Sequence, residues 1–257
     1  MDNACTDDLS LDMATVDGQL AEAPAPPPDP WRERRLLGFG ASDVPVLLHG
    51  FGMREYESPP DYIKAKANHF ISPVGKVPRL ILERAGIKSP LKAGKEVKEL
   101  GNDREQELCF AWKQRLLRGE YACPEEGSLD PNTIRHASSV PQEWFPLVNR
   151  SAPELAVTPD SWCRDEWDCL WQIEFKCSVH EVPALRPWWA DQAQAQLATI
   201  PAVGGMVVCG ERWAAKWRDD GEIRAWPVHR NHTDVAMILE ACRLGWNLVK
   251  QLKEKVG

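Results

Sequence analysis

The stretch that most constrains the fold is Trp171–Cys177, in which apolar and polar residues alternate without a break. Alternation with a period of two is typical of a β-strand, because successive side chains of a strand point to opposite faces. The pattern therefore predicts a half-buried strand. Its polar face is expected to carry Gln172, Glu174 and Lys176. An acid and a lysine two residues apart then point into the same space.

A second acid, Asp160, follows Thr158-Pro159 upstream of this strand. Residues 161–168 are polar enough for a turn or loop, which would return Asp160 beside Glu174 across a hairpin. Two carboxylates and an ammonium group that converge suit a hard divalent cation and a water molecule. The alternative is an ordinary strand with an acid and a base on its solvated face. This stretch alone leaves both interpretations open.

Charge is distributed unevenly along the 257 residues, whose formal net charge is −7. Residues 1–30 hold seven acids, no Lys or Arg, and a run of Ala and Pro, so we expect a disordered tail. Removing those seven from the 38 acids leaves 31, equal to the number of Lys and Arg. Residues 31–257 are therefore expected to form one neutral domain, and neutrality does not exclude DNA binding, because clustering of charge matters more than its sum.

No apolar run approaches the roughly 20 residues that a membrane helix needs, and no secretory signal is visible. The eight cysteines contain no Cys-x-x-Cys pair, which argues against a zinc ribbon or a cysteine-bound iron–sulfur cluster. Reduced thiols in an intracellular protein, in the cytoplasm or a nucleus, are the simpler interpretation.

Order is expected from Trp31, where a basic cluster that includes Arg35 precedes a glycine-rich bend and Ser42-Asp43. A serine at the start of a helix suits phosphate binding, through its hydroxyl and the free backbone N–H groups. A simple helix cap, by Ser42 or by Asp43, explains the same residues.

Residues 96–118 form the best long helix of the first half of the chain. Glu105 shares a helical face with Leu108 and Trp112, whereas Glu107 falls on a mixed face. Glu105 is therefore expected to point inward, where an acid needs a partner, and a metal ion is one.

A glutamine-rich helix is predicted after the strand, across Trp188–Leu197. Helical geometry groups Gln192 with Gln196 and sets Gln194 apart, so only one face can serve a site. Further strands are expected at 205–209 and 222–228, followed by a helix that Thr233 caps and that runs to about Lys255.

Several of these motifs, in this order, resemble the YqaJ-type viral recombinase and lambda exonuclease-like family of PD-(D/E)xK nucleases. The matching residues are Trp31, Arg35, Ser42, Gly101 with Glu105, Pro159-Asp160, Glu174 with Lys176, and the glutamine-rich helix. The chain departs from the family at Arg150, where a further acid is expected. The resemblance covers roughly residues 31–230 by short motifs rather than by continuous similarity.

The resemblance implies an α/β (α+β) fold with a restriction-endonuclease-like core, in which helices flank a central mixed β-sheet. It implies Mg²⁺, with Mn²⁺ able to substitute, bound by Asp160, Glu174, the backbone carbonyl of Phe175 and Glu105. Lys176 would orient the attacking water, and Arg35 and Ser42 would hold a DNA phosphate. The family register selects Gln194 as the glutamine of the site, with Gln192 as second choice.

The implied activity is 5′–3′ exonuclease digestion of linear double-stranded DNA in recombination or repair. A ring-shaped homotrimer and a single-strand annealing protein as partner are implied with it. Two alternatives stay open: an endonuclease or single-strand exonuclease of the same fold, and a non-catalytic DNA-binding recombination scaffold. Intact Asp160, Glu174 and Lys176 count against a scaffold, because charged groups are costly when they lack partners.

Overall fold

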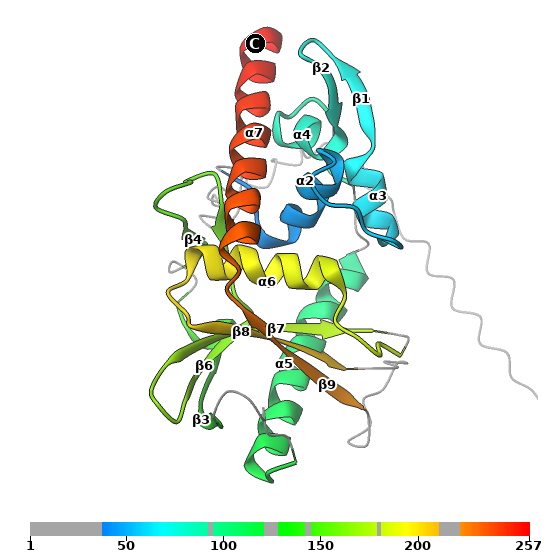
Figure 1. The fold of residues 1–257 in the computed structure, drawn as a ribbon. Helices are drawn as coiled ribbons and strands as arrows, with labels where there is room; N and C mark the ends of the chain where they lie inside the picture. The colour runs from blue at the N-terminus through cyan, green and yellow to red at the C-terminus, as the bar shows by residue number, and fades with distance from the viewer. Residues whose placement is uncertain (1–37, 92–94, 121–127, 142–144, 179–180, 211–221) are drawn as a thin grey trace, which may run out of the picture.

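A five-stranded sheet forms the middle of the molecule (Figure 1). The structure is a computed structural model that describes residues 38–91, 95–120, 128–141, 145–178, 181–210 and 222–257. The strand order is β3-β6-β7-β8-β9, and only β7 and β8 run parallel. The strands are β3 (Leu129–His136), β6 (Ser161–Asp165), β7 (Leu170–Cys177), β8 (Gly204–Gly210) and β9 (Ile223–His229). This mixed sheet with flanking helices confirms the predicted fold class.

Most helices lie on one side of the sheet, which is its upper side in Figure 1. Directly against the sheet lies α6 (Pro187–Thr199), which joins the parallel strands β7 and β8. Above it are the short 3₁₀ turn η1 and four further helices. These are η1 (Ala41–Asp43), α2 (Val44–Gly50), α3 (Asp61–Ala67), α4 (Arg79–Arg84) and α7 (His232–Val256).

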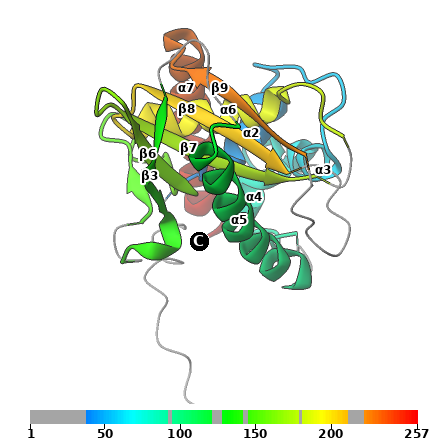
Figure 2. The ribbon, with the colours of Figure 1, turned by 90° about the horizontal axis from the view of Figure 1, so that it is seen from below.

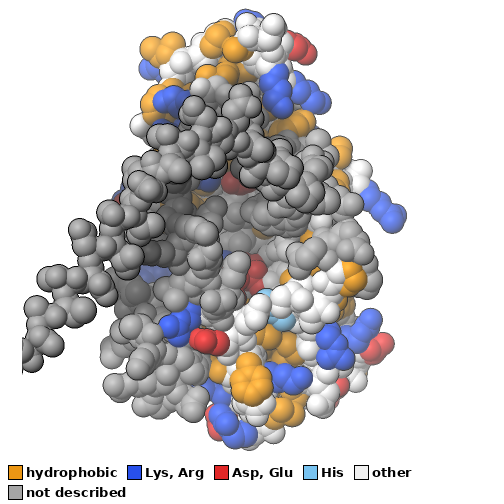
Figure 3. Space-filling view, turned by 180° about the vertical axis from the view of Figure 1, so that it is seen from behind, with side chains coloured by type: hydrophobic (Ala, Val, Ile, Leu, Met, Phe, Trp, Pro, Cys, Tyr) orange, Lys and Arg blue, Asp and Glu red, His pale blue; other side chains and the backbone are white. Residues whose placement is uncertain are grey.

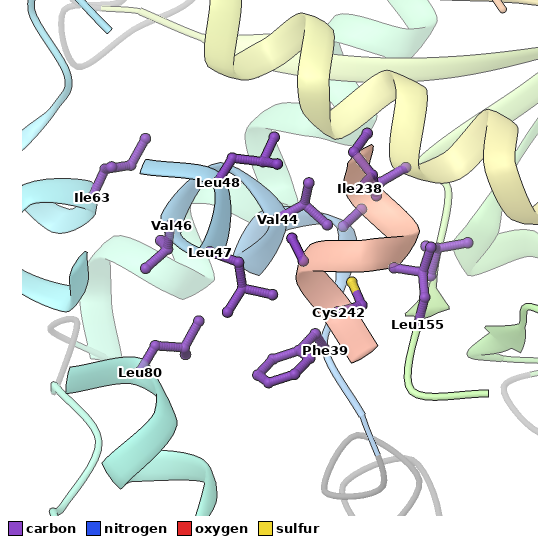
Figure 4. Close-up of a cluster of buried hydrophobic side chains, with 14 of the residues drawn as sticks. Phe39, Val44, Val46, Leu47, Leu48, Ile63, Leu80, Leu155, Ile238 and Cys242 are labelled. Atoms are coloured by element: carbon purple, nitrogen blue, oxygen red, sulfur yellow. The ribbon is translucent and has the colours of Figure 1, made fainter. Parts of the chain in front are cut away.

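Apolar side chains of these helices form the larger core, part of which is shown in Figure 4. Phe39 is completely buried there and meets the Trp246 ring edge-on at 5.8 Å between ring centroids. Its backbone pairs with the segment before β5 (Ala156–Val157), since its N–H donates to the Glu154 carbonyl at 2.7 Å. Phe39 thereby joins three segments that are distant in sequence: its own, the one before β5, and α7.

A second core lies between the opposite face of the sheet and α5 (Lys95–Leu117), which Figure 2 shows from below. Side chains of α5 are described from Arg104 onward. Leu108, Cys109 and Trp112 pack there against Ile173 and Phe175 of β7. Each face of the sheet therefore has its own apolar core.

Two small pairs of strands complete the described fold. The hairpin of β1 (His69–Ser72) and β2 (Gly75–Pro78) lies beside α4, and β4 (Leu147–Val148) pairs with β5. The short 3₁₀ turn η2 (Ala137–Ser139) follows β3. No helix within the described ranges is both long and apolar enough to cross a membrane.

The start of α7 differs from the prediction. Asn231, not Thr233, caps this helix: its side-chain oxygen accepts hydrogen bonds from the backbone N–H groups of Thr233 and Asp234, at 2.9 and 3.2 Å. Either residue type is a good cap, so the sequence places the helix correctly but leaves its first turn ambiguous.

Replacing Phe39 by alanine is expected to lower the free energy of unfolding by about 3–5 kcal/mol, because a buried ring leaves a cavity. Phe110→Ala serves as the matched control, since the Phe110 side chain is 65% exposed on α5. Its effect should stay within about 0.5 kcal/mol. Urea unfolding of both variants tests this, and equal effects would contradict the assigned core.

Candidate active site

The polar face of β7 is buried rather than solvated. Gln172 and Glu174 are 0% and 1% exposed, because α6 lies over them. The alternation correctly separates this face from that of Ile173 and Phe175, which packs against α5. The expectation of a half-buried strand is wrong, since both faces are covered by helices.

Asp160 reaches the same place by a different route from the one predicted. Residues Ser161–Asp165 are not a loop but the strand β6, antiparallel to β7, with Ser161 opposite Ile173. This register sets Asp160, the residue before β6, next to Glu174. Asp160 Oδ2 accepts a hydrogen bond from the backbone N–H of Phe175 at 2.8 Å.

The backbone carbonyl of Phe175 is directed to the same edge as its N–H group. In an antiparallel pair, the N–H and C=O of one residue face the same neighbouring strand. Beyond Ser161 the strand β6 has no residue to pair with Phe175. The carbonyl is therefore available beside the Asp160 carboxylate.

Lys176, at the end of β7, forms an ion pair with Glu174 Oε1. Burial of its ammonium group favours the neutral amine, but the Glu174 and Asp160 carboxylates outweigh this and raise the pKa of Lys176 above its ordinary value. The lysine therefore stays positively charged. Its side chain as a whole is 20% exposed.

Glu105 belongs to the same electrostatic cluster although it comes from α5. Burial raises the pKa of Glu105, Glu174 raises it further, and Lys176 opposes the rise. Glu107 is exposed and pairs with Arg104 at 3.1 Å. The structure thus places Glu105, and not Glu107, near the acids of β6 and β7.

Burial and two neighbouring acids act together on Asp160. Burial raises the pKa of this carboxyl well above its usual range, Glu174 and Glu105 add to the rise, and Lys176 with the Phe175 N–H only partly offset it. Like charges in a poorly hydrated place disfavour ionisation unless a cation neutralises them. A single lysine does not neutralise three carboxylates.

Two glutamines of α6 hold the buried Glu174 carboxylate. The Nε2 group of Gln192 donates to Oε1, and that of Gln196 donates to Oε2. They are one helical turn apart and share a face, as helical geometry predicts. Together with Lys176, they give Glu174 three hydrogen-bond donors.

Gln194, the glutamine selected by family register, does not join this cluster. Its amide donates to the carbonyl of His229 and accepts from the N–H of Asn231 at 3.1 Å, so it connects the end of β9 to the start of α7. Position 194 is two residues from either glutamine of the site, which turns it to another side of the helix.

The two predicted phosphate-binding residues have different outcomes. Arg35 lies outside the described residues. Ser42 is exposed on η1, and its neighbour Asp43 is buried, accepts a hydrogen bond from the Gly40 N–H at 3.0 Å and pairs with Arg84. The inward residue of the Ser-Asp pair is thus structural, and Ser42 faces solvent.

Tyr62, in the first turn of α3, is a residue that the sequence did not suggest. Its side chain is 46% exposed. Partial burial raises the pKa of the Tyr62 phenol, Lys176 lowers it, and Asp43 and Glu174 raise it. The hydroxyl therefore lies within electrostatic reach of the site. No motif marks it, because it reaches the site only through the packing of α3.

The oxygen atoms present suit a hard divalent cation. Within the described residues, no three His, Cys, Asp or Glu side chains are close enough to hold a metal ion by themselves. The donors available are therefore the Asp160 and Glu174 carboxylates together with the Phe175 carbonyl, and carboxylate and carbonyl oxygens are the ligands that Mg²⁺ and Mn²⁺ prefer. Seen from behind, acidic and basic side chains are interspersed over the surface of the described residues (Figure 3).

Comparisons with known proteins support the fold. No protein-family model and no curated protein sequence matches the chain. A crystal structure of an alkaline exonuclease from Laribacter hongkongensis matches with a TM-score of 0.51 and 16% identity, covering 88% of this chain and 94% of that one. The same exonuclease in complex with dAMP matches with a TM-score of 0.51, 15% identity and the same coverage. At this identity the likeness shows that the chain shares the fold of an exonuclease.

Proposed function

We propose that this protein is a metal-dependent deoxyribonuclease that hydrolyses phosphodiester bonds, with linear double-stranded DNA digested from the 5′ end as its substrate. The observation that carries the proposal is the convergence of Asp160, Glu174 and Lys176 where β6 begins and β7 ends. The exonuclease fold of the structural neighbours supports DNA as the class of substrate.

Asp160, Glu174 and the Phe175 carbonyl would hold the cation, and Glu105 would help to hold the metal or its water. A bound Mg²⁺ supplies a Lewis acid and lowers the pKa of a coordinated water. Lys176 would orient that water and offset the negative charge that develops on the phosphate, where electrostatic stabilisation is most effective.

Substrate contacts would come from the side of the site that faces solvent. Arg35 and exposed Ser42 would hold the phosphate, and half-exposed Tyr62 would contact the nucleotide next to it. Gln192 and Gln196 of α6 keep the Glu174 carboxylate oriented. Gln194 then has a structural role, because its hydrogen bonds connect the end of β9 to the start of α7.

Purified full-length protein, Mg²⁺ and end-labelled linear, nicked and circular DNA test the proposal. Digestion of linear DNA from 5′ ends, lost on chelation of the metal, is expected. Cutting of closed circles would instead indicate an endonuclease, and digestion of single strands alone the single-strand alternative. Binding of DNA without cleavage at any metal concentration would indicate a scaffold.

The proposal includes assembly into a ring-shaped trimer and cooperation with a single-strand annealing protein. Both rest on the resemblance to the exonuclease family. The molar mass in solution, with and without DNA, tests the trimer.

Glu174→Gln and Lys176→Met should each reduce the rate of cleavage by at least about 100-fold, a typical loss when one preorganised electrostatic group is removed. Both variants should remain folded because the two apolar cores stay intact, but each should lose some stability because it removes a partner of the buried ion pair. Cleavage rates and circular dichroism measure the two effects. Near-normal activity of either variant would exclude the assigned site.

Glu105→Gln and Glu107→Gln form a matched pair two residues apart on α5. Only Glu105 interacts with Glu174 and Lys176, so its substitution should reduce cleavage at least about 10-fold, while Glu107→Gln stays near wild type. Rates at saturating DNA measure this. The reverse order would exclude Glu105 from the site.

Asp160→Asn should raise the melting temperature in the absence of divalent ions, because it removes a carboxylate whose charge is disfavoured by burial and by two other acids. A gain of 1 kcal/mol corresponds to about 2–4 °C for a protein of this size. Mg²⁺ should stabilise the wild type but not this variant. Scanning calorimetry with and without Mg²⁺ measures both effects, and a wild type insensitive to Mg²⁺ would contradict the cation site.

A further inference from the structure

Behind the catalytic carboxylate lies a buried polar side chain without a partner. Gln172 is 0% exposed, and within the described part of the chain neither its Oε1 nor its Nε2 has a hydrogen-bond partner. Gln196 is also 0% exposed, and its Oε1 lacks a partner although its Nε2 donates to Glu174. Buried amide groups without partners are costly and rare, so each needs an explanation.

The sheet makes room for Gln172 at one position of β8. Gly205 pairs with Gln172 across the parallel strands. A Cβ atom at position 205 would lie 2.2 Å from the Gln172 Nε2 atom, which is far inside van der Waals contact. A glycine is therefore required here for the Gln172 amide to lie across β8 under α6.

The path of the chain brings Gln196 toward Gln172. Because α6 joins two parallel strands, it runs back across β7 from the Lys176 end to the Leu170 end. The chain after α6 returns to the start of β7, where the Val203 N–H donates to the Leu170 carbonyl at 2.9 Å. Gln196 thus faces the part of β7 that precedes Glu174, and Gln192 faces the part that follows it.

We propose that Gln172 is a positioning residue for Glu174 and acts through Gln196. In the working site, the Gln172 Nε2 donates to the Gln196 Oε1, and the Gln196 Nε2 donates to the Glu174 carboxylate. This rests on the proposed function, since it concerns the residue assigned to hold the cation.

The chemical reason lies in the two ends of a side-chain amide. One end of Gln196 donates and the other accepts, so a rotation by 180° would turn its oxygen toward the Glu174 carboxylate and repel it. A donor from Gln172 on the Gln196 oxygen prevents that rotation. Groups behind a metal ligand that fix its orientation commonly change metal affinity or activity by about 10- to 100-fold when removed.

Gln172→Met tests the inference, because methionine has a similar volume and no amide. A fully buried polar group without a role in the site should be dispensable, and its replacement by an apolar side chain should leave activity unchanged. A positioning role predicts an unchanged or higher melting temperature together with a loss of about 10- to 100-fold in kcat and no change in the KM for linear DNA. Calorimetric binding of Mg²⁺ should weaken in the same variant.

Gly205→Ala and Gly204→Ala form the matched controls. A Cβ at position 204 would meet the Trp171 ring at 2.6 Å, on the opposite face of the sheet, so both variants disturb β8 but only the first displaces Gln172. Only Gly205→Ala should lower kcat beyond its effect on stability. The double variant Gln172→Met with Gln196→Met should have the same kcat as Gln196→Met alone. Gln172 acts on Glu174 only through Gln196, so the two losses should not add.

The outcomes separate the two proposals. Active wild type and equally active Gln172→Met, with equal Mg²⁺ binding, would overturn the positioning role and leave the proposed function intact. An inactive wild type would overturn the proposed function, and the Mg²⁺ affinities of wild type and Gln172→Met would then decide the positioning role alone. Additive losses of kcat in the double variant would also overturn the positioning role of Gln172.

Discussion

Burial of one carboxylate organises the centre of this structure. Glu174 is 1% exposed, and a charge in such a place is tolerated only when it is paired and hydrogen-bonded. Its partners come from two elements, Lys176 on β7 and two glutamines one turn apart on α6. The direction of α6 over the sheet is therefore constrained by a polar requirement as well as by apolar packing.

The two cores make this arrangement rigid. Beneath β7, Ile173 and Phe175 pack against α5, and above it α6 packs against the helices of the larger core. Arg54 adds a polar connection, since it pairs with Asp191 of α6 at 2.7 Å and with Asp234 of α7. The Glu174 carboxylate thus lies between two packed layers, so its charge is poorly hydrated and its interactions are strengthened.

The sequence predicts those parts of the site that depend on local periodicity. Alternation assigns Glu174 and Lys176 to one face, and helical phase separates Glu105 from Glu107. Burial of the polar face could not be predicted, because it depends on where α6, which begins ten residues after the end of β7, comes to lie. The choice among the glutamines depends on the same crossing, which is a tertiary property.

The strand β6 was missed for a related reason. Ser161, Cys163 and Asp165 are its buried residues, and two of these three are polar. Asp165 is satisfied by the N–H groups of Trp167 and Cys169 and by the Trp171 indole, contacts that exist only once the hairpin forms. Polarity alone therefore indicates a loop. Tyr62 could not be predicted from the sequence, because it lies near the site only through the tertiary packing of α3 and no local pattern marks it.

Pairing of Ser161 with Ile173 has a consequence for folding errors. If β7 slipped by one residue against its neighbours, every side chain would change face. Glu174 and Lys176 would then enter the apolar layer between the sheet and α5, and Ile173 and Phe175 would face the glutamines of α6. Such a misaligned sheet would bury the Glu174–Lys176 ion pair in an apolar core without the two glutamine donors, so the residues proposed for catalysis also disfavour an incorrect register of the sheet.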